Sequence, residues 1–308
     1  MKKHRLLMLM FASAAVLFIG CEKEEVSESR TDPSEGGTAW PERRISSITI
    51  NEALLQRSVN CHFTWNDNKI SEIVYTDGNE TISYSFAYKD DRVANTHYSY
   101  SSSNVEKETD FEYHYSNGRI DKVIIHIPLD NEDYEYYLQG IDEEHLPYLT
   151  VEYDNDGNVS KISEYYWLYR ENQDGLTLCN GQVGTYSYSN GNVTTVSYEN
   201  GFGLSFEYDN HPSPLSFPVG VVESLSFPLE FGDKYGGLDY TVFIFDRESE
   251  EVFFGNFLGN KNNMTRMNYR HYETAYSYDY DASGMYPTTM YIVEGGNKYP
   301  FCYFTYEN

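Results

Sequence analysis

Aromatic and polar residues alternate along most of the chain from Ile45 onward. Side chains two positions apart lie on the same face of a β-strand, so this spacing predicts strands with one aromatic face. Helical spacing occurs only in one short candidate, Asn51 to Val59. The alternating sets are Tyr84, Phe86 and Tyr88; Phe111, Tyr113 and Tyr115; Tyr186 and Tyr188; Phe206 and Tyr208; and Tyr276, Tyr278 and Tyr280.

The aromatic strands belong to a loose repeat of aromatic strand, tight turn and β-branched strand. Turn pairs such as Asn117-Gly118, Asp156-Gly157 and Asn190-Gly191 are strong signals for two-residue hairpins, because type I′ turns need positive φ at both positions. Gly118 and Gly191 are therefore expected in the left-handed region. The turn and β-branched parts of the repeat are residues 68–73, 91–96, 118–123, 157–162 and 191–196.

The uneven spacing of these copies predicts a meander of hairpins and not a uniform solenoid. We expect an all-β domain over residues 45–308, built as a long antiparallel meander of β-hairpins that curls or rolls into an open barrel or shell around an aromatic core. Residues 211–240 contain Pro212, Pro214, Pro218 and Pro228. Proline disfavours central strands, so this stretch predicts an excursion or a subdivision of the domain.

The N-terminus has the pattern of an export signal. A basic start, residues 1–5, precedes an apolar run, residues 6–19, which is shorter than the roughly 20 residues that a spanning helix needs. Residues 17–21, Leu-Phe-Ile-Gly-Cys, resemble a bacterial lipobox. The resemblance implies a lipoprotein signal peptide over residues 1–20 and a lipid on Cys21. The alternative is a plain signal peptide with an incidental cysteine.

Residues 21–44 are charged and nearly devoid of apolar side chains, which predicts a flexible acidic tether. The cluster Glu22-Lys23-Glu24-Glu25 follows Cys21 directly. It resembles the surface-display signal of outer-membrane lipoproteins in Bacteroides-type bacteria. The resemblance implies an outer-membrane protein exposed at the cell surface, with a periplasm-facing position as the alternative.

The chain is strongly acidic, with 22 Lys and Arg against 48 Asp and Glu and a net charge of -26. Loss of residues 1–20 would remove three more positive charges. Such a field repels nucleic acids and anionic lipid headgroups. We therefore expect no nucleic-acid partner, and membrane attachment through the lipid on Cys21. The remaining partner classes are a neutral glycan and an envelope protein.

Metal and catalytic motifs are weak throughout. With a regular hairpin turn, His114 faces Asp121 and His126 faces Thr109, so these histidines and His97 are expected to lie too far apart to share a metal. The sequence holds no nucleophile, phosphate-loop or zinc motif. It predicts no catalytic residue, no metal and no cofactor, although a hydrolase that uses scattered carboxylates remains an alternative.

Two further patterns are ambiguous. Residues 154–158, Asp-Asn-Asp-Gly-Asn, begin like a calcium loop but lack its later ligands, so a hairpin turn is the better interpretation. If Cys21 is lipidated, Cys61, Cys179 and Cys302 remain. They are interpreted as small buried hydrophobes, and one disulfide is left open without a preferred pair.

The strand-Tyr-Asp/Asn-x-x-Gly units resemble the YD repeats of Rhs-type shells. The arrangement over about residues 45–306 resembles more closely a family of uncharacterised lipoproteins from Bacteroides-type gut bacteria. That family has no established activity, so the resemblance implies a fold and no mechanism. Its features here are the break at residues 210–212, Asn260, Asn262 and Asn263, and the closing unit at residues 278–287.

The tyrosine rows recur in every repeat, which favours a structural role in the sheet. The run Tyr166, Trp167 and Tyr169 lies outside the repeat and is the best candidate for a binding surface, because aromatic side chains offer wide and rigid contact areas. We expect a non-enzymatic binding or scaffold module for a glycan or protein at the cell envelope. A purely structural envelope protein is a second alternative to the hydrolase.

Overall fold

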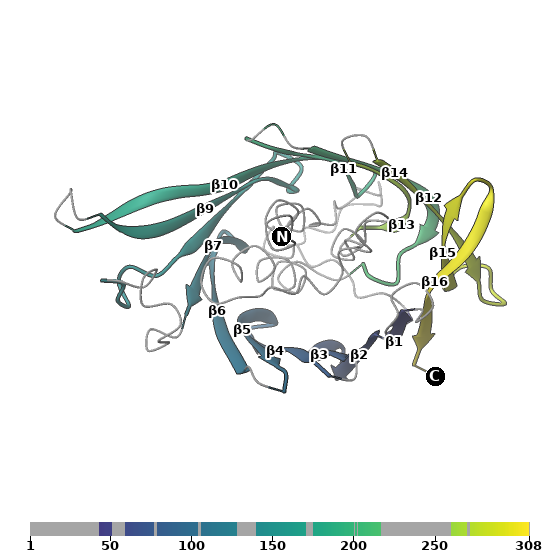
Figure 1. Cartoon of the computed structure of the whole chain (residues 1–308), viewed down its shortest axis with the longest axis horizontal. Coiled ribbons are helices and arrows are strands. Elements are labelled where there is room, and N and C mark those ends of the chain that lie inside the picture. Colours follow the sequence, from purple (N-terminus) through teal and green to yellow (C-terminus); the bar gives the residue numbers. More distant parts are fainter. Residues whose placement is uncertain are drawn as a thin grey trace, which may run out of the picture.

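The computed structural model describes residues 43–50, 59–76, 79–103, 106–127, 140–170, 175–199, 201, 203–216, 260–269 and 272–307. The elements in these ranges are all strands (Figure 1). No helix in the described part of the chain has the length and apolarity needed to cross a membrane. The strands are β1 (Ile45–Ile50), β2 (Val59–Asn66), β3 (Lys69–Thr76), β4 (Thr81–Lys89), β5 (Arg92–Ser101), β6 (Glu106–Ser116), β7 (Arg119–His126), β8 (Tyr148–Tyr153), β9 (Val159–Arg170), β10 (Gly175–Ser189), β11 (Asn192–Tyr198), β12 (Gly203–Pro212), β13 (Asn262–Tyr269), β14 (Tyr272–Tyr280), β15 (Pro287–Glu294) and β16 (Asn297–Tyr306).

Every strand pairs antiparallel with its neighbours in the sequence, and β1 also pairs with β16. The all-β meander predicted from the sequence is confirmed. The meander closes completely, because Ile48 of β1 pairs with Cys61 of β2 on one side and with Phe304 of β16 on the other. Of the helix candidate Asn51 to Val59, residues 51–58 lie outside the described residues and Val59 begins β2.

Two of the three predicted two-residue turns have the predicted backbone. The prediction for Asp156-Gly157 is wrong, because only Gly157 has a positive φ there and residues 154–158 form a longer loop between β8 and β9. Asn117 and Gly118 have φ of 51° and 81°, and Asn190 and Gly191 have φ of 53° and 77°. Positive φ at both positions is what a type I′ turn requires. The left-handed conformation expected for Gly118 and Gly191 is therefore confirmed.

The predicted aromatic faces point into the barrel. On β4, Ile82, Tyr84 and Phe86 are buried, whereas Ser83 and Ser85 between them are only partly buried. The other aromatic rows contribute to the same continuous core, whose largest fully buried side chains include Tyr98 and Phe111. The inward-facing side chains are thus mainly apolar and aromatic.

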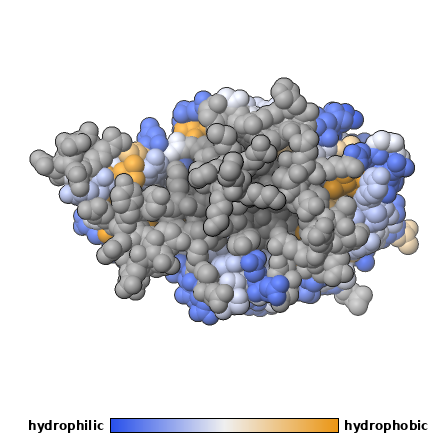
Figure 2. Space-filling view, viewed as in Figure 1, coloured by the Kyte–Doolittle hydropathy of each residue, from blue (hydrophilic) through white to orange (hydrophobic). Residues whose placement is uncertain are grey.

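The outer face of the barrel carries mainly polar and charged side chains, and the described surface is mostly hydrophilic (Figure 2). On β6, for example, Glu108, Asp110, Glu112 and His114 alternate with the inward-facing Phe111 and Tyr113. Transmembrane barrels have the opposite arrangement, with an apolar band outside and polar side chains inside. The described outer face therefore lacks the pattern of a lipid-facing surface.

One end of the barrel, which we call the turn end, is held by a repeated hydrogen bond. An aromatic residue near the end of a strand donates to the backbone carbonyl near the start of the preceding strand, over 2.6–2.9 Å. We call each such bond a latch. The latches join Trp65 to Ile45, Tyr88 to Ile70, Tyr115 to Val93, Tyr153 to Ile120, Tyr208 to Val193, Tyr278 to Met264 and Tyr306 to Pro287.

A cation covers several of the latch rings. The charged group lies 5.1–5.5 Å from the ring centroid in the pairs Arg44–Trp65, Lys69–Tyr88, Arg92–Tyr115 and Arg119–Tyr153. Each of these cations directly precedes the residue whose carbonyl accepts the latch. In these four pairs, the basic residue and the backbone carbonyl of the β-branched residue that follows it therefore contact the same aromatic side chain of the next strand.

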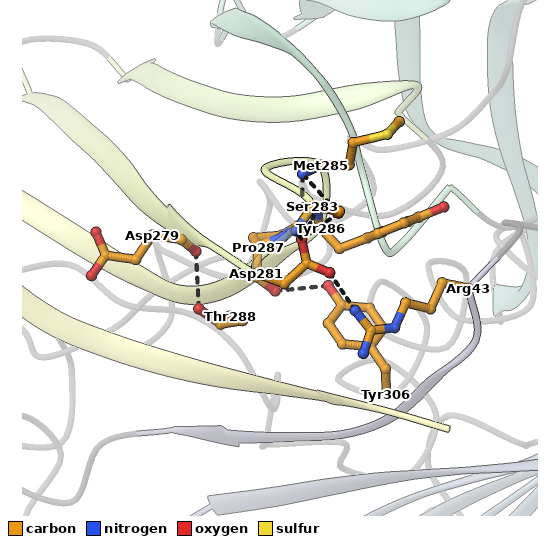
Figure 3. Close-up of polar contacts among 9 residues, drawn as sticks. All are labelled: Arg43, Asp279, Asp281, Ser283, Met285, Tyr286, Pro287, Thr288 and Tyr306. Carbon is orange, nitrogen blue, oxygen red and sulfur yellow. Dashed lines mark hydrogen bonds and ion pairs between the residues drawn. The ribbon is translucent and has the colours of Figure 1, made fainter. Parts of the chain in front are cut away.

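Arg43 fastens the start of the barrel to its last hairpins (Figure 3). Its Nη1 lies 2.5 Å from Asp281 Oδ2, and its guanidinium carbon lies 4.6 Å from the centroid of Tyr306. Asp281 Oδ1 in turn accepts hydrogen bonds from the amide and hydroxyl groups of Ser283, and the bond from the hydroxyl lowers the pKa of Asp281. The ion pair joins the start of the barrel to the β14–β15 turn, and the contact with the Tyr306 ring adds a side-chain contact to the closure between β1 and β16.

The proline-rich stretch begins inside β12, because Pro212 still pairs with Asn262 of β13. β12 ends at Pro212, residues 213–216 form a turn, and β13 begins at Asn262. Residues 217–259, with Pro218 and Pro228, lie outside the described residues. The predicted subdivision of the domain there stays a prediction.

The three cysteines of the barrel form no disulfide with one another. Cys61 and Cys302 are buried in the core, where burial raises the pKa of both thiols. They flank β1, pairing with Ile48 and Ile50 respectively. Cys179 on β10 is only partly buried, so the interpretation as a buried hydrophobe fits the first two cysteines alone.

Candidate functional site

The predicted binding run on β9 is divided between the two faces of the sheet. Tyr166 turns inward and packs against the core. Trp167 and Tyr169 pair with Leu178 and Leu176 of β10, and 43% of Tyr169 is exposed. Because successive side chains of a strand point to opposite faces, the structure brings Trp167 and Tyr169 together and separates Tyr166 from them.

The outward residues belong to a larger surface, which we call the outer aromatic patch. It lies on the outer face of three neighbouring strands, where Tyr148 pairs with Tyr165 and the two leucines pair with Trp167 and Tyr169. Figure 2 shows hydrophobic colour beside the projecting β9–β10 hairpin. The patch consists of Tyr148 of β8, Tyr165, Trp167 and Tyr169 of β9, and Leu176 and Leu178 of β10.

The patch is raised above the barrel wall because β9 and β10 are longer than their neighbours. β8 begins only at Tyr148, opposite Tyr165, whereas β9 continues to Arg170 and β10 starts at Gly175. The upper part of this hairpin therefore projects from the barrel, as seen at the left of Figure 1. Tyr148 and Tyr165 are not predicted as site residues by the sequence, because their pairing depends on a register that no local signal gives.

The aromatic rings of the patch are held in fixed orientations. Tyr148 and Tyr165 stack with centroids 4.9 Å apart and an interplanar angle of 16°. Lys122 Nζ lies 4.2 Å from the centroid of Tyr148. Partial burial and the neighbouring Tyr165 phenol raise the pKa of Tyr148, so this phenol stays neutral at physiological pH.

Residues 140–147 border the patch. The His145 ring meets Trp167 edge to face, with centroids 4.7 Å apart and an interplanar angle of 88°. Asp142 fixes this histidine through an Oδ1–Nδ1 distance of 2.6 Å, and that contact together with the Glu144 amide lowers the pKa of Asp142. At Gly140, a Cβ would lie 3.6 Å from the Tyr169 ring. The border thus supplies polar groups beside the aromatic rings.

A second cluster, the Asp209 network, lies at the turn end. Asp209 Oδ1 accepts the amides of His211 and Asn263 at 2.9 Å and 3.2 Å. Its Oδ2 accepts the hydroxyl of Tyr280 and lies 3.4 Å from His211 Nδ1. The His211 ring also stacks on Tyr280, with centroids 4.2 Å apart. Burial and the bond to Asp209 raise the pKa of Tyr280.

Buried asparagines extend the Asp209 network. Asn192 and Asn262 exchange two hydrogen bonds of 2.9 Å. The side-chain oxygen of Asn260 accepts the Val193 amide and the Tyr208 hydroxyl, at 2.9 Å and 3.0 Å. The three motif segments from the family resemblance therefore meet at one place, where their polar groups bind one another. This arrangement indicates a structural joint between β11, β12, β13 and β14.

The register predicted for the histidines on β6 and β7 is wrong. A bulge between His114 and Tyr115 places His114 opposite Lys122 and His126 opposite Asp110. The two carboxylate oxygens of Glu112 then contact His114 Nε2 at 3.1 Å and His126 Nε2 at 3.0 Å. His97 pairs separately with Asp110 at 2.8 Å. Within the described ranges, no group of three or more His, Cys, Asp or Glu is arranged to hold a metal ion.

The segment that begins like a calcium loop is a hairpin turn. Asp154 Oδ1 accepts the backbone amides of Asp156 and Asn158, at 2.9 Å and 2.8 Å, and Gly157 has a φ of 91°. The Asp154 carboxylate, which would be the first calcium ligand, thus binds the backbone amides of its own turn. This agrees with the interpretation drawn from the sequence.

The solved structures to which the chain is similar share little sequence with it. No family model matches the chain, and no curated protein matches it. A porin-like protein from Bacteroides uniformis is 14% identical with a TM-score of 0.44, covering 87% of this chain and 100% of its own. A porin-like protein from Bacteroides vulgatus is 11% identical with a TM-score of 0.32, covering 86% of this chain and 99% of its own.

Proposed function

We propose that the protein is a lipid-anchored, surface-displayed binding module of the outer membrane, without enzymatic activity. The barrel itself would stand in water, because its described outer face is polar and its apolar side chains face inward. The lipid on Cys21 would attach it to the membrane, and residues 22–44 would set its distance from the surface. Two acyl chains suffice for stable anchoring.

The outer aromatic patch is the observation that carries the binding role. On a mostly polar exterior, it gathers aromatic and leucine side chains on a hairpin that projects from the barrel. Tyr169 and Leu178 are 43% and 39% exposed. A cluster of exposed apolar side chains with a polar border is typical of a binding site. The purely structural role is less favoured, since such a role needs no such cluster.

The hydrolase alternative has less support. The carboxylates that lie closest to histidines are engaged in ion pairs on the outer face or in the Asp209 network. The Asp209 network has the character of a structural joint. Binding is therefore the function that the described geometry supports best.

The anchor is tested by the substitution Cys21→Ser. We expect the variant to take up no fatty-acid label and to move from the detergent phase to the aqueous phase in a phase-partition assay. The lipobox requires a thiol at this position, and the polar barrel would not retain the protein in detergent. Label on the serine variant would contradict the anchor, and persistence in the detergent phase would contradict the polar exterior.

Binding is tested with the full chain in a non-glycosidic detergent, against neutral and acidic glycan arrays and against isolated envelope proteins. We expect saturable binding to one of these classes. Absence of binding to all of them would contradict the proposed function.

A further inference from the structure

We infer that the outer aromatic patch is a site for a neutral oligosaccharide, which stacks on Trp167 and Tyr169 and forms hydrogen bonds with the border at residues 140–147. The inference rests on the proposed function and names the class of ligand and the surface that takes it. The proposed site lies on three neighbouring strands, whereas the site predicted from the sequence is the run 166–169 of a single strand.

The size of the patch favours a small ligand over a protein. A stable protein interface buries about 800 Å² on each partner and involves about 20–30 residues a side. The patch gathers six side chains, and Ile124 of β7 extends it by one where it pairs with Tyr148. A few aromatic rings with polar groups at their edge match a sugar, whose apolar ring face is rimmed by hydroxyl groups.

The patch is ordered before any ligand arrives. Tyr165 is held by its stack with Tyr148, and the Trp167 ring is held by its edge-to-face contact with His145, which Asp142 fixes in turn. Immobilising a side chain on binding costs about 0.5–1.5 kcal/mol, and a preorganised site avoids most of that cost. This matters for sugars, because each stacking contact is weak.

The border supplies hydrogen-bonding groups at the right place. Asp142 is 62% exposed, so its carboxylate can accept sugar hydroxyls while it still holds His145, and the His145 side chain is 30% exposed. A carboxylate accepts hydrogen bonds through two oxygens. The polar groups therefore lie along one side of the Trp167 ring, which fixes a direction for the sugar.

Charge selects against acidic glycans. The patch itself contains no charged side chain, and its border carries Asp142, Glu143 and Glu144. Lys122 is the cation that contacts the patch, and its Nζ lies over the Tyr148 ring. Because the chain as a whole carries a net charge of -26, a uronate or sulfated sugar would be repelled.

The test uses the full chain in a non-glycosidic detergent with neutral gluco-, galacto- and manno-oligosaccharides, measured by calorimetry. A uronate oligomer is the acidic comparison. We expect at least one neutral series to bind and the uronate to bind at least tenfold more weakly. Trp167→Ala should weaken binding by about 10- to 100-fold, the loss typical of an aromatic hot spot.

Two variants separate recognition from folding. Tyr169→Ala removes a side chain that is 43% exposed, so it should weaken sugar binding at least fivefold without lowering the melting temperature. Tyr303→Ala on β16, also 43% exposed but outside the patch, should leave the affinity unchanged. If Trp167→Ala unfolds the protein, Tyr169→Ala alone decides the matter.

Several results would overturn the inference. These are an affinity that neither Trp167→Ala nor Tyr169→Ala changes, a preference for the uronate, or an equal loss with Tyr303→Ala. Binding to an envelope protein but to no sugar would overturn the ligand class and leave the proposed function standing. Binding to nothing would defeat both.

Discussion

Asp209→Ala should lower the free energy of unfolding by about 2–4 kcal/mol, because it leaves several partly buried donors without an acceptor. The Asp209 carboxylate receives the amides of His211 and Asn263 and the hydroxyl of Tyr280. Its side chain is only 17% exposed, so water cannot easily replace it. Urea unfolding of the full chain, followed by tyrosine fluorescence, measures the change.

The matched control is Glu207→Ala, two residues earlier on β12. Glu207 is 62% exposed and contacts Arg266 at 3.4 Å, so its loss should cost less than about 1 kcal/mol. Asp209→Asn should give an intermediate cost, since the amide keeps one acceptor oxygen. Equal stabilities for the two alanine variants would show that the Asp209 network does not hold β12, β13 and β14 together.

Phe111→Ala should destabilise the barrel by about 3–5 kcal/mol, the usual cost of removing a large buried aromatic side chain. Phe111 is 1% exposed and points into the core from β6, between Thr96 of β5 and Ile125 of β7. The variant leaves a cavity in a closed barrel, where the surrounding strands cannot collapse freely. A thermal or urea melt in water measures the loss.

Glu108→Ala on the outer face of the same strand is the comparison. Glu108 is exposed, so its substitution should change the unfolding free energy by about 0.5 kcal/mol or less. A large cost at Glu108 with little cost at Phe111 would mean that the barrel is turned inside out, with its apolar face toward lipid. The pair thus tests the polar exterior on which the proposed function depends.

The sequence predicted the faces of the strands well and the closure poorly. The spacing of Tyr84, Phe86 and Tyr88 alone places them on one face, and burial of that face follows from its apolar character. Pairing of β1 with β16 joins Ile45 to Tyr306, which carry no local signal for each other. The alternation alone therefore predicts an open barrel or shell, and it does not predict that the first and last strands pair.

Register explains the other departures from the sequence analysis. The bulge between His114 and Tyr115 moves His126 next to Glu112, and nothing in a single strand announces that bulge. Similarly, the run from Tyr166 to Tyr169 is continuous in the sequence, but the alternation of side chains along β9 places Tyr166 on the inner face and Trp167 and Tyr169 on the outer face. Tyr148 could join the candidate site only once its partner Tyr165 was known.

The latches also make the barrel sensitive to alkali. Burial raises the pKa of the latch phenols of Tyr88, Tyr208, Tyr278 and Tyr306 above the ordinary value near 10. Below about pH 10 these phenols are protonated in both the folded and the unfolded chain, and their contribution is constant. Above it, the unfolded chain releases protons that the folded barrel retains, so stability falls by up to about 1.4 kcal/mol per pH unit for each phenol. The tyrosines that close the turn end at neutral pH are thus the groups through which base would open it.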